Sequence, residues 1–139
     1  MKPATIASVS AGWMLDSRAT PTIEVAVVLT DGTVHRAMAP SGASTGSHES
    51  VELRDTEDPS WRGLGVSRAV EAVRRVVDPA LRGMAVDSQA DVDRRLIEAD
   101  GTERRDRIGA NAMVAASVAC ARAGAAQAGR PLWRHLQRS

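Results

Sequence analysis

Short runs of β-branched and apolar residues dominate the first third of the chain. Residues 22–29 and 33–38 form two such runs, and Asp31 and Gly32 lie between them. An Asp-Gly pair between two apolar segments is a strong signal for a β-hairpin. A further apolar run over residues 6–15 precedes a polar turn, so the pattern predicts a three-stranded antiparallel meander.

Downstream, apolar residues recur at the spacing of amphipathic helices. Residues 67–77 carry alanine and valine three and four positions apart, which predicts a first helix. Asp78 and Pro79 follow directly, and Gly83 comes shortly after them. Because a proline lacks the main-chain N–H and crowds the preceding turn, we expect the helix to end there.

A second helix is predicted over residues 88–99. Asp87 or Ser88 can cap its first turn with a side-chain oxygen, and Asp100 and Gly101 are expected to stop it. We expect three apolar side chains on its inward face, namely Val92, Leu96 and Ile97.

The last long helix is predicted over residues 109–128, with Gly129 as its C-terminal signal. It consists mostly of alanine and other small residues, and a helix that is apolar on most faces must be buried on most faces. A small domain offers little cover, so we expect this helix to support an exposed apolar face that meets another domain or subunit. The predicted fold class is α+β: a three-stranded antiparallel β-meander followed by an α-helical bundle, in one domain over residues 1–139.

Residues 41–46 follow Pro40 and are all small, a composition typical of a mobile surface loop. Residues 42–46 also match the G-x-S-x-G pattern of hydrolase nucleophile elbows. That elbow requires a large parallel sheet, which the hydrophobic pattern does not predict. A phosphate-binding G-x-x-x-x-G-K-[ST] loop is excluded because Lys2 is the only lysine in the chain.

Composition and charge narrow the classes of function. The 18 Lys+Arg residues balance 17 Asp+Glu residues, so nothing indicates a nucleic-acid partner. No apolar run is long enough for a membrane span, and the N-terminus lacks the apolar core of a signal peptide. The single cysteine, Cys120, is expected to be buried and favours a cytoplasmic location. Among three histidines, only His48 lies beside the 41–46 loop.

Several ordered motifs resemble the N-terminal domain of enolases. They include D-S-R with P-T-I-E-V, A-P-S-G-A-S-T-G, H-E with E-L-R-D, D-G-T, I-G-A-N-A and P-L-W. The segments that carry them are residues 16–18, 21–25, 39–46, 48–55, 100–102, 108–112 and 131–133. The resemblance extends from about Ile6 to Leu136, which is nearly the whole chain.

The resemblance implies a domain that caps a larger β/α barrel in a Mg²⁺-dependent enzyme. That enzyme dehydrates 2-phosphoglycerate to phosphoenolpyruvate, and a related phospho or phosphonate compound is the alternative substrate. The barrel supplies carboxylates for one Mg²⁺ and a lysine base, so no catalytic residue is expected in this chain alone. By resemblance, Ser44 binds the second Mg²⁺ through its oxygens. The other expected substrate-loop residues are Ser41, Gly42, Ala43, Thr45, Gly46 and His48.

The chain departs from the family pattern at positions that bear on assembly. Ala19 and Thr20 replace a Gly-Asn pair. Gly12 stands where the family often has an arginine that forms an ion pair across a subunit interface. Glu24 is present at the position of the acidic residue that takes part in the family's dimer contact. The usual homo-oligomer would therefore lose one contact.

Three hypotheses follow from the resemblance. The first is a capping subunit that needs a separate barrel chain, because the sequence stops at Ser139, where the barrel is expected to begin, and Lys2 cannot serve as its base. The second is a non-catalytic protein-interaction module derived from enolase. The third is a truncated fragment of an ordinary enolase. All three predict exposed apolar surface.

Overall fold

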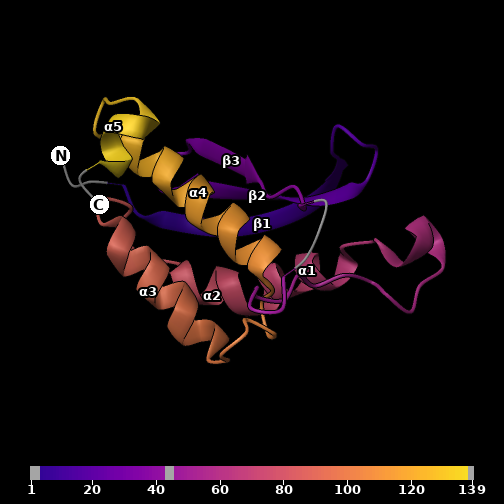
Figure 1. Ribbon diagram of the computed structural model, residues 1–139. Helices are drawn as coiled ribbons and strands as arrows, with labels where there is room; N and C mark the ends of the chain where they lie inside the picture. The colour runs from indigo at the N-terminus through magenta and orange to yellow at the C-terminus, as the bar shows by residue number, and fades with distance from the viewer. Residues whose placement is uncertain (1–3, 43–45, 138–139) are drawn as a thin grey trace.

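The computed structural model describes residues 4–42 and 46–137 (Figure 1). Its sheet consists of β1 (Ile6–Leu15), β2 (Pro21–Leu29) and β3 (Val34–Met38) in the order β1-β2-β3. Both strand pairs are antiparallel, so the predicted meander is confirmed. A hydrolase elbow would require a parallel sheet.

The two turns of the meander are stabilised by aspartates. Asp31 Oδ1 accepts a hydrogen bond from the Thr33 N–H at 2.9 Å, and Gly32 adopts a φ of +85°. Asp16 Oδ1 accepts from the N–H groups of Arg18 at 2.8 Å and Thr20 at 2.9 Å. These hydrogen bonds lower the pKa of Asp16, and the bond from Thr20 has the largest effect. Ala19, in the same turn, adopts a left-handed φ of +57°.

The first helical stretch is longer than the sequence predicted. It comprises α1 (Ser67–Ala72), the π-helical segment η2 (Val73–Val77) and α2 (Asp78–Leu81) without interruption. The expectation that Asp78 and Pro79 end the helix was therefore wrong. In a π-helical turn the hydrogen bonds join residues i and i+5, so the turn is wider than in an α-helix. The wider turn lies just before Pro79, whose missing N–H would break the hydrogen-bond pattern of a regular helix.

Helix α3 (Gln89–Asp100) begins and ends where the sequence predicted. Ser88 Oγ accepts from the Asp91 N–H at 3.3 Å, and Gly101 closes the helix with a φ of +69°. Val92 and Leu96 are buried, as expected. Ile97 is 45% exposed, so its assignment to the inward face was wrong. It lies one position beyond the stripe that packs on the neighbouring helix.

Helix α4 (Ala110–Gln127) crosses the sheet and also contacts α3 and α5 (Leu132–Leu136) (Figure 1). Its alanines are small enough to let the sheet approach closely, and most of them are fully buried within this chain. Of its large apolar side chains only Val114 is mainly exposed. The sheet, α3 and α5 thus cover most of α4, but Val114 and the nearby Ile97 of α3 are exposed along an apolar groove between the two helices. Contact of this face with another domain stays a prediction. Cys120 is buried in this layer, as predicted, and burial raises the pKa of its thiol to about 12.

Large exposed apolar side chains gather instead at the far end of β1. Trp13 is 55% exposed, and its ring lies edge-on to that of Trp61 with centroids 5.7 Å apart. Trp61 belongs to the connector, defined as residues 51–66, which contains the short helix η1 (Ser60–Gly63). Leu15 and Leu64 are also exposed. The described residues include no helix long and apolar enough to cross a membrane.

Candidate functional site

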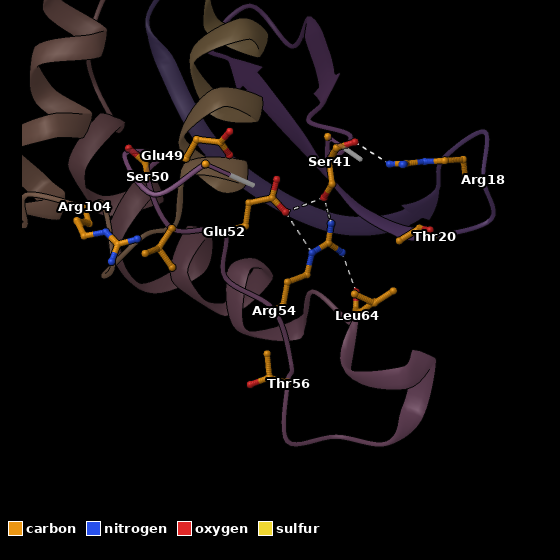
Figure 2. Close-up of a pocket in the computed structure, with 13 residues that line it drawn as sticks. Arg18, Thr20, Ser41, Glu49, Ser50, Glu52, Arg54, Thr56, Leu64 and Arg104 are labelled. Atoms are coloured by element: carbon orange, nitrogen blue, oxygen red, sulfur yellow. Dashed lines mark hydrogen bonds and ion pairs between the residues drawn. The ribbon is translucent and has the colours of Figure 1, made fainter. Parts of the chain in front are cut away.

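A cavity of about 550 Å³ opens between the end of β3, the β1–β2 turn and the connector (Figure 2). Its lining includes three arginines and two glutamates beside apolar surface. The lining residues are Arg18, Thr20, Ser41, Gly42, Gly46, Glu49, Ser50, Val51, Glu52, Arg54, Thr56, Leu64 and Arg104. The 41–46 loop predicted from the sequence thus begins and ends at the rim of this cavity.

Ser41 is held on both its side chain and its main chain. Its hydroxyl donates to Glu52 Oε2 at 2.6 Å and accepts a hydrogen bond from Arg54. Its carbonyl oxygen accepts from the guanidinium of Arg18 at 2.7 Å. In Figure 2, Arg18 approaches Ser41 from one side, and Glu52 and Arg54 approach it from the other. The start of the 41–46 loop is therefore fixed by three charged side chains.

Arg54 connects Ser41 to two other segments. Its guanidinium donates to the carbonyl oxygen of Leu64 at 2.7 Å and to that of Pro21. It also lies 3.4 Å from Glu52 Oε2. Only 10% of its side chain is exposed. A guanidinium presents several donors in one rigid plane, so Arg54 ties the first residue of β2, the connector and the loop together.

The beginning of the connector is docked onto the start of α4. Asn111, which is buried, accepts from the Leu53 N–H at 3.2 Å and donates to the Leu53 carbonyl at 3.1 Å. Val51 pairs with both flanking segments, through Arg104 at 2.8 Å and Ala110 at 2.7 Å. These bonds satisfy buried main-chain groups that have no secondary-structure partner.

Asp55 joins the connector to the first turn of α1. Its carboxylate accepts from the N–H groups of Ser67 at 2.8 Å and Arg68 at 3.0 Å. Burial alone would raise its pKa, but hydrogen bonds from Arg68 and Ser67 outweigh that effect, and the pKa of Asp55 is lowered. Gly65 is required beside it, because a Cβ there would lie 2.5 Å from Asp55 Oδ2.

The structure brings together part of the predicted site. Ser41, Gly42 and Gly46 line the cavity. Ala43, Ser44 and Thr45 lie outside the described residues, and with them the predicted metal ligand. His48 is exposed and lines a neighbouring cavity of about 300 Å³.

Glu24 does not line the cavity and lies on the face of β2 that points away from α4. It pairs with Arg36 of β3 at 3.5 Å and stands opposite Gly12 in the sheet register. Within the part of the chain that the structure describes, no atom beyond Gly12 and its two chain neighbours lies within 4 Å of the position that a Cβ on Gly12 would occupy. The departure at Gly12 therefore leaves open space beside Glu24.

Three residues of the site had no role assigned from the sequence: Arg18, Glu52 and Arg54. All three belong to segments that carry the resemblance, and that membership was the available signal. Among residues 4–42 and 46–137, no three His, Cys, Asp or Glu side chains gather as a metal-ligand set. The described arrangement can orient a loop and present guanidinium donors to an anion.

Comparison with known proteins identifies the domain. The family described as "Enolase, N-terminal domain" matches residues 6–136. A protein named enolase from Methanopyrus kandleri is 52% identical over 131 residues, which cover 94% of this chain. The same alignment covers 30% of that relative, so the chain spans less than a third of its length.

Proposed function

The chain belongs to the enolase N-terminal domain family, and from this we propose that residues 1–139 act as the capping part of an enolase-type enzyme. The reaction is the dehydration of 2-phosphoglycerate to phosphoenolpyruvate, or the same chemistry on a related phospho or phosphonate compound. A β/α barrel, on a separate chain or on the remainder of a longer one, supplies the base. The observation that carries this proposal is 52% identity with an enolase over almost the entire domain.

In the proposed enzyme this chain contributes the 41–46 loop. Arg18, Glu52 and Arg54 hold Ser41, and so fix the point from which the loop extends. Ser44 is proposed as a ligand of the second Mg²⁺, because a hydroxyl and a carbonyl oxygen are donors that this hard cation prefers. The remaining ligands come from the barrel. When bound, Mg²⁺ would supply positive charge beside the substrate carboxylate.

Glu24 is proposed as a contact to another subunit. Its carboxylate already has Arg36 as a partner in this chain, and the space over Gly12 leaves it accessible from the adjacent strand. An arginine of a partner subunit can approach through that space. Reversal of the charge at Glu24 should then weaken assembly without altering the cavity.

The test begins with purification from the native host. A tag on this chain, with Mg²⁺ present throughout, should recover a barrel of about 250 residues or more, either as a stoichiometric partner or on the same polypeptide. The recovered material should dehydrate 2-phosphoglycerate, and Ser44→Ala should abolish most of that turnover while circular dichroism stays unchanged. Turnover that is indifferent to Ser44→Ala would contradict the proposed role of the loop.

A non-catalytic interaction module is the second candidate, and the exposed rings of Trp13 and Trp61 favour it. Exposed aromatic patches of this kind mark binding surfaces. Recovery of a stoichiometric partner without barrel sequence would support this candidate over the enzyme. In that case Ser44→Ala should leave the affinity for the partner unchanged, and Trp13→Ala should reduce it.

A further inference from the structure

Arg54 differs from the other arginines near the cavity in its burial. Its side chain is 10% exposed, whereas that of Arg18 is 49% exposed. Burial of a guanidinium is costly unless its donors are satisfied. A nearly inaccessible arginine therefore indicates that its hydrogen-bond partners hold it in one orientation.

The partners of Arg54 account for most of its donor capacity. One terminal nitrogen donates to two carbonyl oxygens, those of Pro21 and Leu64. The other terminal nitrogen donates to Ser41 Oγ, and Nε lies 3.4 Å from Glu52 Oε2. A guanidinium has five N–H donors in a fixed plane, so these partners set both the position and the tilt of the group.

The bond from Arg54 also decides what the Ser41 hydroxyl does. A hydroxyl has one proton to donate. Because Ser41 Oγ accepts a hydrogen bond from Arg54, the hydroxyl proton of Ser41 points to Glu52 Oε2, at 2.6 Å. Arg54 and Glu52 together therefore hold the Ser41 hydroxyl through two hydrogen bonds. Arg18 fixes the adjoining carbonyl at 2.7 Å.

We propose that Arg54 is a positioning residue for the reaction: it fixes Ser41 and Gly42 at the cavity rim and couples them to the connector at Leu64. Arg54 acts through Ser41 and is not assigned any contact with the substrate. Its effect on turnover rests on the proposed function, whereas its effect on Ser41 and Leu64 is a property of this chain alone. The two effects are tested separately.

The first experiment uses the isolated chain and records amide signals by nuclear magnetic resonance. Arg54→Lys keeps the charge but cannot reach all four partners. We expect the signals of Ser41 and Gly42 to shift together with that of Gly65, which follows the Leu64 carbonyl. Ser41→Ala should shift only the first pair. The matched control is Arg94→Lys, on the exposed face of α3, which should shift none of them.

Unchanged signals for Ser41 and Gly42 in folded Arg54→Lys would overturn the positioning role. An unchanged amide signal for Gly65 alone, in the same folded variant, would overturn the coupling of Ser41 to the connector. Circular dichroism and thermal unfolding of the same samples identify a variant that has merely lost its fold. Should Arg54→Lys fail to fold, Glu52→Gln provides the alternative, because it weakens the bonds that Glu52 accepts from Ser41 and from Nε of Arg54, and its side chain is more exposed.

The second experiment uses the assembled enzyme. Arg54→Lys should lower kcat between about tenfold and about 100-fold, the range expected for a misplaced group, with KM changed little. A raised KM with unchanged kcat would contradict positioning and indicate a contact with the substrate. If the wild-type assembly dehydrates neither 2-phosphoglycerate nor a related phospho or phosphonate compound, the proposed function fails, and the amide signals still decide whether Arg54 positions Ser41.

Discussion

The layer of α4 on the sheet and the connector are held together by different forces. In the layer, small side chains of α4 lie directly on β2 and β3, and the contact is almost wholly apolar. In the connector, Asn111, Arg54 and Asp55 satisfy main-chain groups that no helix or strand pairs. The layer should therefore be sensitive to added volume, and the connector to the loss of a single polar partner.

The strongest test of this difference adds one methyl group to the close packing of α4, on the side where this helix meets Val86 and α5. A Cβ at Gly124 would overlap the Val86 carbonyl oxygen and lie 2.9 Å from His135 Nε2. Gly124→Ala should lower the free energy of unfolding by about 3 kcal/mol, measured by urea denaturation. Gly12→Ala is the matched control, because nothing lies within 4 Å of its Cβ position. A small effect at Gly124 would mean that the layer can relax, and the contrast would disappear.

The corresponding test of the connector removes a polar partner. Asn111→Ala leaves the N–H and carbonyl of Leu53 buried without partners, which should cost about 2 kcal/mol in urea denaturation. Gln127→Ala is the control, since the side-chain amide of Gln127 donates a hydrogen bond to the carbonyl oxygen of Ala4 at 2.8 Å but is exposed. Equal costs at the two positions would show that burial of the bond is not what matters.

Acidification should weaken the connector and spare the layer. The pKa of Asp55 lies below the ordinary 3.8 in the folded chain, so the unfolded chain binds the proton first as pH falls. The stabilisation by Asp55 is complete above about pH 4 and is lost as pH falls through the lower folded pKa. Unfolding free energies between pH 3 and 7 should fall less steeply for Asp55→Asn than for the wild type. Parallel profiles would refute this assignment.

The smallest expected effect concerns strain beside the cavity. Ala19 is exposed and adopts a φ of +57°, a region that disfavours any residue with a Cβ. Ala19→Gly should therefore stabilise the chain by about 0.5 kcal/mol, measured as a raised Tm. Ala126→Gly, at an exposed position in α4, should have the opposite sign and cost about 1 kcal/mol. Destabilisation by Ala19→Gly would mean that the extra conformational entropy of glycine in the unfolded chain outweighs the strain that is relieved in the folded turn.

Local signals predicted the strands and most helix ends correctly. Asp31 and Gly32 form a turn that is closed by a hydrogen bond from Thr33 to Asp31. Ser88 and Gly101 cap the two ends of helix α3. Such contacts depend on neighbours in the sequence. Pro79 was misjudged because the helix passes through a π-helical segment just before it, and that segment lies against β1, which is distant in the sequence.

The site was less accessible to sequence reasoning because its contacts are distant along the chain. Ser41 and Arg54 are separated by 13 positions, and Arg54 and Pro21 by 33. Neither spacing has a periodicity that identifies the pair. The resemblance pointed to Ser41, Gly42 and Gly46, which do line the cavity. Arg18, Glu52 and Arg54 lie within the motifs of the resemblance, but their role in holding Ser41 follows from their three-dimensional contacts.

The burial of Cys120 has a practical consequence for spectroscopy. The chain contains no other cysteine, and a thiol with a pKa near 12 has almost no thiolate at neutral pH. A maleimide dye or a thiol-reactive spin label should therefore not react with Cys120 in the folded chain. A cysteine introduced at an exposed position such as Ser47 would become the single labelled site. The native sequence thus provides a background in which the rim of the cavity can be watched by fluorescence or electron paramagnetic resonance without any compensating mutation.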